Sequence, residues 1–137
     1  MKTYRIIAVA AALFVAAIPA LPMAQTPDVS LGDIKRTNLL RHDLSASGRE
    51  VIQVLVEFGP GVSAARHSHP GEELVYVTEG ALEYRLEGKP PVIVKAGDVL
   101  FIPRGTPHAV KNVSTAKAAE LATYIVEKGK PLLVLSE

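Results

Sequence analysis

The sequence predicts an all-β fold, and three observations support this prediction. From residue 51 onwards, apolar and polar side chains alternate over runs of about four to eight residues, which is the period of a half-buried strand. These runs are separated by turn-forming segments such as Gly-Pro-Gly at 59–61 and Glu-Gly-Lys-Pro-Pro at 87–91. The chain shows no amphipathic helical pattern of three turns and no internal repeat. Short strands and turns in this succession are typical of a sandwich or a barrel.

The expected strands follow one another along the chain. The run at 51–58 places Ile52, Val54, Val56 and Phe58 on one face. Residues 116–119 could form a helical turn before the strand expected at 121–126. The remaining expected strands lie at 38–43, 74–77, 81–86, 92–94, 99–102, from His108 onwards, 121–126 and 132–135.

Residues 1–24 have the features of a cleavable signal peptide. Lys2 and Arg5 form a basic start, residues 6–21 are mostly apolar, and Ala24 precedes the polar Gln25. A membrane anchor is the alternative, but the apolar run is short for a bilayer span and prolines interrupt its end. We therefore expect a periplasmic or secreted protein that is not held in a membrane after cleavage.

The rest of the chain has room for one domain. Residues 25–37 are polar at first and contain Pro and Gly, so we expect a mobile N-terminal arm, followed by a barrel domain at 38–137. Loss of the presequence removes Lys2 and Arg5 from fifteen basic residues and leaves thirteen against fourteen acidic ones. A nearly neutral chain argues against nucleic acid as a partner. Without cysteine, stability must come from the core, a metal or a partner subunit.

Two stretches, 61–80 and 97–112, hold three of the four histidines. His67 and His69 stand two residues apart, and Glu73 follows after four more, which predicts that all three share one face of one extended segment. Imidazole nitrogen and carboxylate oxygen are donors that divalent transition metals accept. His108 is the candidate for a further ligand from the second stretch, whereas His42 is expected to have no special role.

Both stretches resemble the two sequence motifs of the cupin family at every specified position. The resemblance implies a double-stranded β-helix, or jelly-roll, barrel with one metal ion in its lumen. It assigns the ligands to His67, His69, Glu73 and His108. Glu72 competes with Glu73, but only Glu73 stands an even number of residues from the first two histidines. The matching positions are Gly61, His67, His69, Glu73 and Gly80 in the first motif and Gly97, Pro103, Gly105, His108 and Asn112 in the second.

Four protein ligands leave a six-coordinate metal two open positions for water, dioxygen or a chelating substrate, unlike a closed structural site. Side chains expected to line the lumen are Val75, Val77, Val110 and Tyr84. The absence of Trp and the few aromatic residues make a sugar-stacking site less favoured. We expect a small enolisable or hydroxylated substrate that chelates the ion.

Two classes of function remain open. The first resembles quercetinase-like cupin dioxygenases, in which Glu73 both ligates the metal and accepts the substrate proton, with Tyr84 as a second catalytic candidate. The second is a non-catalytic periplasmic module that binds a metal or a small ligand, and a non-redox isomerase or lyase lies between them. The cofactor is one divalent transition-metal ion, with iron, manganese, copper, nickel, cobalt and zinc all open.

We also expect a homodimer. A jelly roll of this size exposes sheet edges, which a second subunit commonly covers. Val51 and Leu55 add apolar side chains to the outer face of the strand at 51–58. That face is therefore the expected subunit interface.

Overall fold

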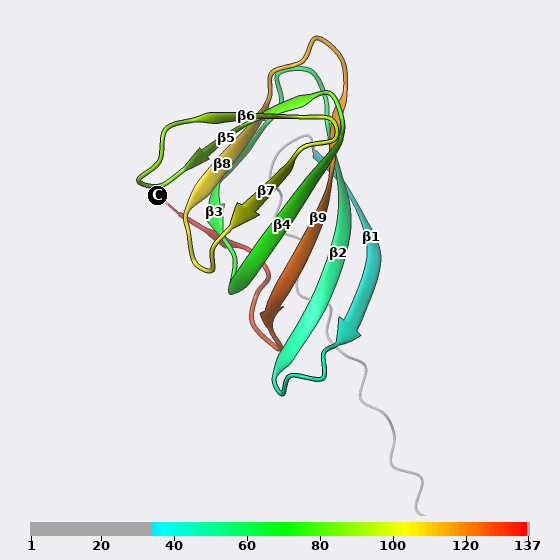
Figure 1. The fold of residues 1–137 in the computed structure, drawn as a ribbon, viewed down its shortest axis with the longest axis vertical. Helices are drawn as coiled ribbons and strands as arrows, with labels where there is room; N and C mark the ends of the chain where they lie inside the picture. The colour runs from blue at the N-terminus through cyan, green and yellow to red at the C-terminus, as the bar shows by residue number, and fades with distance from the viewer. Residues whose placement is uncertain (1–33, 137) are drawn as a thin grey trace, which may run out of the picture.

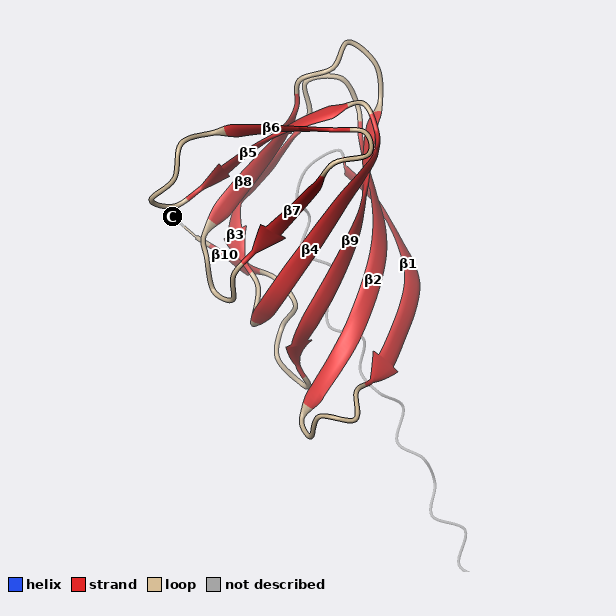
Figure 2. Cartoon of the chain, viewed as in Figure 1, coloured by secondary structure: helices blue, strands red, loops and turns tan. Residues whose placement is uncertain are grey.

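Ten strands form two five-stranded antiparallel sheets in the computed structural model, which describes residues 34–136 (Figures 1 and 2). The strand order is β1-β2-β9-β4-β7 in the first sheet and β10-β3-β8-β5-β6 in the second. The strands are β1 (Ile34–Asp43), β2 (Arg49–Phe58), β3 (Ser63–Ser68), β4 (Gly71–Glu79), β5 (Ala81–Leu86), β6 (Val92–Lys95), β7 (Val99–Ile102), β8 (His108–Asn112), β9 (Ala118–Glu127) and β10 (Val134–Leu135).

The prediction of an all-β jelly roll is confirmed. Residues 34–136 contain no helix, and therefore none with the length and hydropathy needed to cross a bilayer. The strands β5 and β7 have the expected bounds, and residues 118–119 belong to β9. The expected strand at 132–135 is shorter, because only Val134 and Leu135 pair with β3.

The barrel begins earlier in the chain than expected. Strand β1 starts at Ile34, so residues 34–37 belong to the first sheet and not to a mobile arm. They pair with β2 from Ile34 opposite Phe58 to Thr37 opposite Leu55, which satisfies backbone groups that an arm would leave to water. The expected signal peptide at 1–24 and the rest of the arm at 25–33 lie outside the described residues and remain predictions.

The core lies between the inner faces of the two sheets. Along β2 the inward side chains are buried at every second position, as the alternation predicts. Each fully buried aliphatic side chain of this kind contributes about 1.5–3 kcal/mol relative to an exposed one. The largest fully buried apolar side chains are Tyr84, Phe58, Leu82, Ile102, Val54, Val75, Val77 and Val126.

Exposed apolar side chains gather on a face other than the expected one. Val51 and Leu55 are half-buried, because β2 lies between β1 and β9. The outer faces of β4 and β7 are more open, and in that pair Leu74 stands opposite Phe101 and Tyr76 opposite Val99. The homodimer remains a prediction, and β4–β7 replaces β2 as the face to examine.

Gly71 allows the start of β4 to lie unusually close to β9. A Cβ atom added at Gly71 would lie 2.0 Å from the backbone oxygen of Ile125. Only glycine therefore lets β4 begin directly against β9, which it pairs from Gly71 opposite Val126 onwards. This register fixes the inward direction of Glu73, two residues later.

Candidate metal site

Three separate elements deliver the four predicted ligands. His67 lies in β3, His69 directly follows that strand, Glu73 lies in β4 and His108 begins β8. The prediction that His67, His69 and Glu73 share one extended segment is therefore wrong. Strand β3 ends before Pro70, which has no N–H to donate, and the chain crosses to the other sheet, so Glu73 faces the histidines from the opposite wall.

The four side chains nevertheless converge. His67 and His108 are directly opposite each other in the β3–β8 pair, and their ring centroids are 4.4 Å apart. The ring of His69 lies 4.9 Å from that of His67 and 5.2 Å from that of His108. One donor atom from each histidine lies within 4.8 Å of the others. The carboxylate oxygen Oε2 of Glu73 lies 3.2 Å from Nε2 of His69 and 3.3 Å from Nε2 of His108. All four residues are buried.

Backbone carbonyls orient all three imidazoles. Nδ1 of His67 donates to the carbonyl of Ala65 at 2.6 Å, and Nδ1 of His108 donates to that of Thr106 at 2.9 Å. Nδ1 of His69 donates to the carbonyl of Leu132 at 2.7 Å, across 63 positions of the chain. A carbonyl can only accept, so Nδ1 carries the hydrogen and, in a neutral ring, Nε2 has a free lone pair. Such contacts are typical of the residues that orient metal-ligating histidines.

The arrangement fits a bound cation. Among the described residues, Nε2 of His69 and Oε2 of Glu73 are buried and have no hydrogen-bond partner. Two lone pairs that face each other at 3.2 Å repel unless a cation or a proton lies between them. Three imidazole nitrogens and one carboxylate oxygen are a donor set for a divalent transition metal.

The electrostatics of the site favour the ligating forms of its groups. Burial lowers the pKa of His67 to about 4, with further lowering from His108 and His69, so this imidazole stays neutral at physiological pH. Burial acts to raise the pKa of Glu73, but hydrogen bonds and positive charge from His108 and His69, when protons occupy their Nε2 atoms, outweigh it and hold that pKa well below its usual range. A cation bound at the same point acts in the same direction. Glu73 is therefore a carboxylate, as metal ligation requires.

Glu73, and not Glu72, is directed into the barrel. Glu73 is buried beside the histidines, whereas Glu72 is half-exposed on the outer face of β4. The choice of Glu73 therefore agrees with the cupin motif, but the spacing argument does not apply, because the chain turns at Pro70 and the period of two begins anew in β4.

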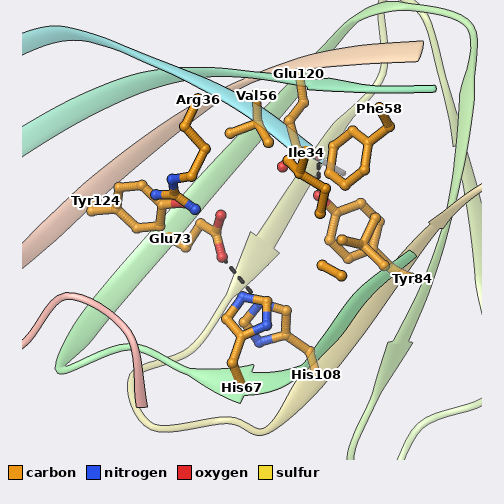
Figure 3. Close-up of a pocket in the computed structure, with 12 residues that line it drawn as sticks. Ile34, Arg36, Val56, Phe58, His67, Glu73, Tyr84, His108, Glu120 and Tyr124 are labelled. Atoms are coloured by element: carbon orange, nitrogen blue, oxygen red, sulfur yellow. Dashed lines mark hydrogen bonds and ion pairs between the residues drawn. The ribbon is translucent and has the colours of Figure 1, made fainter. Parts of the chain in front are cut away.

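Three of the four predicted ligands, His67, Glu73 and His108, line a small cavity in the barrel (Figure 3). Its volume is about 10 Å³, room for about one water molecule. Tyr84 and Val110 line it as predicted, whereas Val75 and Val77 are buried elsewhere in the core. The lining residues are Ile34, Arg36, Val56, Phe58, Ala64, His67, Glu73, Tyr84, His108, Val110, Glu120 and Tyr124.

Sequence reasoning missed three polar residues of this lining. Arg36 comes from β1, and Glu120 and Tyr124 come from β9. A signal for Glu120 was present, because it stands at even spacing from Ala122, Tyr124 and Val126 and therefore on the buried face of its strand. No local pattern marked Arg36.

Glu120 is a buried acid on the wall that faces the histidines. Its side chain accepts a hydrogen bond from the hydroxyl of Tyr84, and the residue is 4% exposed. Burial raises the pKa of Glu120 to about 8, and repulsion from Glu73 adds to the increase. Burial and the nearby charge of Glu120 also raise the pKa of Tyr84. At neutral pH both groups therefore carry their protons.

Comparison with known proteins connects this geometry to a family. The family model for the cupin domain matches residues 54–131. The oxalate-binding protein of Thermotoga maritima is 29% identical over 96 residues, which make up 69% of this chain and 78% of that protein. Dimethylsulfoniopropionate lyase DddQ of Ruegeria pomeroyi is 42% identical over 45 residues, which make up 33% of this chain and 22% of the lyase. This chain thus matches less than a quarter of that lyase.

A solved structure of an oxalate oxidase in complex with the substrate analogue glycolate has the same fold. It superimposes with a TM-score of 0.61 and 26% sequence identity. The superposition covers 84% of this chain and 60% of the oxidase.

Proposed function

Since the chain belongs to the cupin family, we propose that it is an exported metal-dependent oxidoreductase of the dioxygenase type, acting on a small chelating substrate. The observation that carries the proposal is the buried set of four donors, two of whose atoms have no hydrogen-bond partner in the described chain. The adjoining cavity of about 10 Å³ favours a small substrate over a polycyclic one. The names of an oxalate oxidase and an oxalate-binding protein among its relatives are consistent with this size.

A redox-active ion, when bound, supplies Lewis acidity for the chelating substrate and the one-electron chemistry that dioxygen requires. The chain's own residues provide the setting. The carbonyls of Ala65, Thr106 and Leu132 keep Nε2 of each imidazole directed at one point. Glu73 is ionised at neutral pH and is the group we assign to accept the proton that an enol or hydroxyl group loses when it chelates; its lowered pKa makes it a weak base, which suits only a proton that binding to a cation has made acidic.

Tyr84 on β5 and Glu120 on β9 form a second polar pair that joins the two sheets. Their hydrogen bond joins two protonated groups that line the same cavity as Glu73. A buried acid with a pKa of about 8 can release a proton to a nearby anionic product and recover it from solvent. The apolar lining from Val56, Phe58 and Val110 limits bulk water around this transfer.

The same pair of protonated groups favours a second candidate, a non-redox lyase or isomerase. Such a reaction needs an internal acid and base, which Glu120 and Glu73 would provide, and a metal that serves only as a Lewis acid. A binding module without catalysis is the third possibility, supported by the oxalate-binding relative, of which this chain covers 78%.

Metal content and oxygen uptake test the proposal. We would express the full chain with its export signal, purify the protein and determine its metals by elemental analysis. Oxygen consumption would then be measured with a panel of small 2-hydroxy, 2-oxo and dicarboxylic acids and 1,2-diketones. His108→Ala serves as the control that removes a ligand. Oxygen uptake that depends on a redox-active ion and is lost in the control supports the dioxygenase.

Other outcomes assign the protein to the other classes. Conversion of a substrate without oxygen uptake in a zinc-loaded protein contradicts the dioxygenase and supports the lyase or isomerase. Tight binding without conversion supports the binding module. Export is tested separately by N-terminal sequencing of the protein recovered from the periplasm, which is expected to begin near residue 25.

A further inference from the structure

The cavity beside the metal site has a second polar end. His67 and His108 lie together on one side of it and Arg36 and Tyr124 on another, with the carboxylate of Glu73 between the two groups (Figure 3). The guanidinium of Arg36 reaches inward from β1 and lies beside the ring of Tyr124 and near the carboxylate of Glu73. Nothing in the four-ligand metal site requires a cation at this place.

Arg36 is the sole lysine or arginine among the described residues that line the cavity. The side chain is half-buried, and no salt bridge joins it to any residue between 34 and 136. Its neighbour Lys35 is directed outward and pairs with Glu57 at 2.8 Å. A partly desolvated guanidinium presents a planar array of donors that matches a carboxylate.

Glu120, the second acid of the cavity lining, does not neutralise Arg36. Glu120 is engaged by the hydroxyl of Tyr84, and burial and the charge of Glu73 keep its pKa at about 8. Arg36 acts against that increase but does not reverse it. At neutral pH Glu120 is therefore uncharged and repels an anionic ligand little.

The formal charge of the loaded site is positive. A divalent ion and Arg36 supply three positive charges, and Glu73 and Glu120 are the only acids among the described lining residues, so the sum stays positive even with both of them ionised. Net positive charge in a buried cavity with room for about one water molecule is strongly stabilised by an anion. The charge balance therefore indicates an anionic ligand with acceptor oxygens at both ends.

We propose that Arg36 is a carboxylate-binding residue of this site, and that the ligand is a carboxylic acid of only a few heavy atoms whose second oxygen donor is directed to the metal end. This inference rests on the proposed function, since it assumes that the same cavity binds a metal-chelating substrate. The small volume excludes a large acid. A cavity with room for about one water molecule must widen to admit even such an acid, and Arg36 and Ile34, which line it, lie on the edge strand β1.

Binding of oxalate and glycolate to the metal-loaded protein tests the inference. Titration calorimetry under anaerobic conditions measures affinity without turnover, and glycolamide serves as an uncharged analogue of glycolate. Arg36→Gln is expected to weaken binding of both acids by at least about tenfold, because a desolvated charge pair is lost. Arg36→Lys retains the charge but not the planar pair of donors, so its affinity for both acids is expected to lie between that of wild type and that of Arg36→Gln.

Lys35→Gln is the matched control, because it removes the same charge from the same strand outside the cavity. It is expected to change affinity by less than about twofold, as exposed charges contribute little. Metal content and melting temperature of each variant establish that the site and the fold are retained. If Arg36→Gln prevents folding, the comparison of Arg36→Lys with wild type decides, since it must still show weaker binding.

The outcomes separate this inference from the proposed function. Equal affinity of Arg36→Gln and wild type would refute the role of Arg36 and leave a metal-chelating site intact. Equal affinity for glycolamide and glycolate would refute the selection of anions, again without affecting the metal centre. If the loaded wild-type protein binds neither acid, both the inference and a small chelating acid as ligand are refuted.

Discussion

Replacing Glu120 by glutamine is expected to stabilise the metal-free protein at alkaline pH and not at acidic pH. Glu120 is buried, and its pKa is raised from 4.5 to about 8 by burial and by the charge of Glu73. Between these two values the folded protein binds a proton that the unfolded chain has released. Its contribution to stability is therefore fully present below about pH 4.5 and is lost as the pH rises through about 8. Glutamine keeps the shape and does not titrate.

The size of the effect follows from the width of this interval. Each pH unit corresponds to 1.36 kcal/mol per proton, so between pH 5 and pH 8 the wild type loses at most about 4 kcal/mol relative to the variant. Entry of water or local relaxation reduces this amount, and we expect about 2–4 kcal/mol. His67 has the opposite sign, because its lowered pKa makes the protein less stable as pH falls from 6.5 to about 4. Both proteins contain His67, so its contribution cancels in the difference.

Urea unfolding of wild type and Glu120→Gln at pH 5, 6.5 and 8, with chelator present, measures the difference directly. Glu72→Gln on the outer face of the same barrel is the control and should show little change with pH. A difference between Glu120→Gln and wild type that is constant across the three pH values would mean that Glu120 titrates normally. The proposed neutral wall of the cavity would then be wrong.

Two further predictions concern the metal site. Most of the bound metal is expected to be lost when any one histidine is replaced, as in His67→Ala, His69→Ala or His108→Ala. Glu73→Gln is expected to weaken metal binding less, because a neutral oxygen ligand remains. Elemental analysis measures the metal content, and full occupancy in His108→Ala would contradict the site. Removal of the metal by a chelator is expected to lower the melting temperature by roughly ten degrees at neutral pH, because the ion would join segments from both sheets. Near pH 5 the decrease should be smaller, because protons compete with the ion for the imidazoles. Equal melting temperatures with and without metal at neutral pH would show that the barrel forms independently of the ion.

The local sequence was sufficient to predict features that depend on neighbouring residues, namely which side chains of a strand face the core and where some strands begin and end. Alternation along β2 correctly assigned which side chains face the core, whereas the spacing of Glu73 from the histidines did not apply across the turn at Pro70. The strands β5 and β7 were bounded correctly because turn residues flank them on both sides. These features depend on the alternating directions of neighbouring side chains, a property of any extended chain.

The sequence by itself thus determined the all-β class and the buried faces, because strand period can be read from neighbouring positions, and its resemblance to the cupin motifs singled out four candidate ligands. Only the tertiary structure decided that Glu73 faces the histidines from the other sheet, that the Leu132 carbonyl orients His69, and that Arg36 and Glu120 share one cavity. These contacts join residues far apart in the chain. They depend on which strands pair and how the sheets pack, and no local pattern records the position of a distant segment.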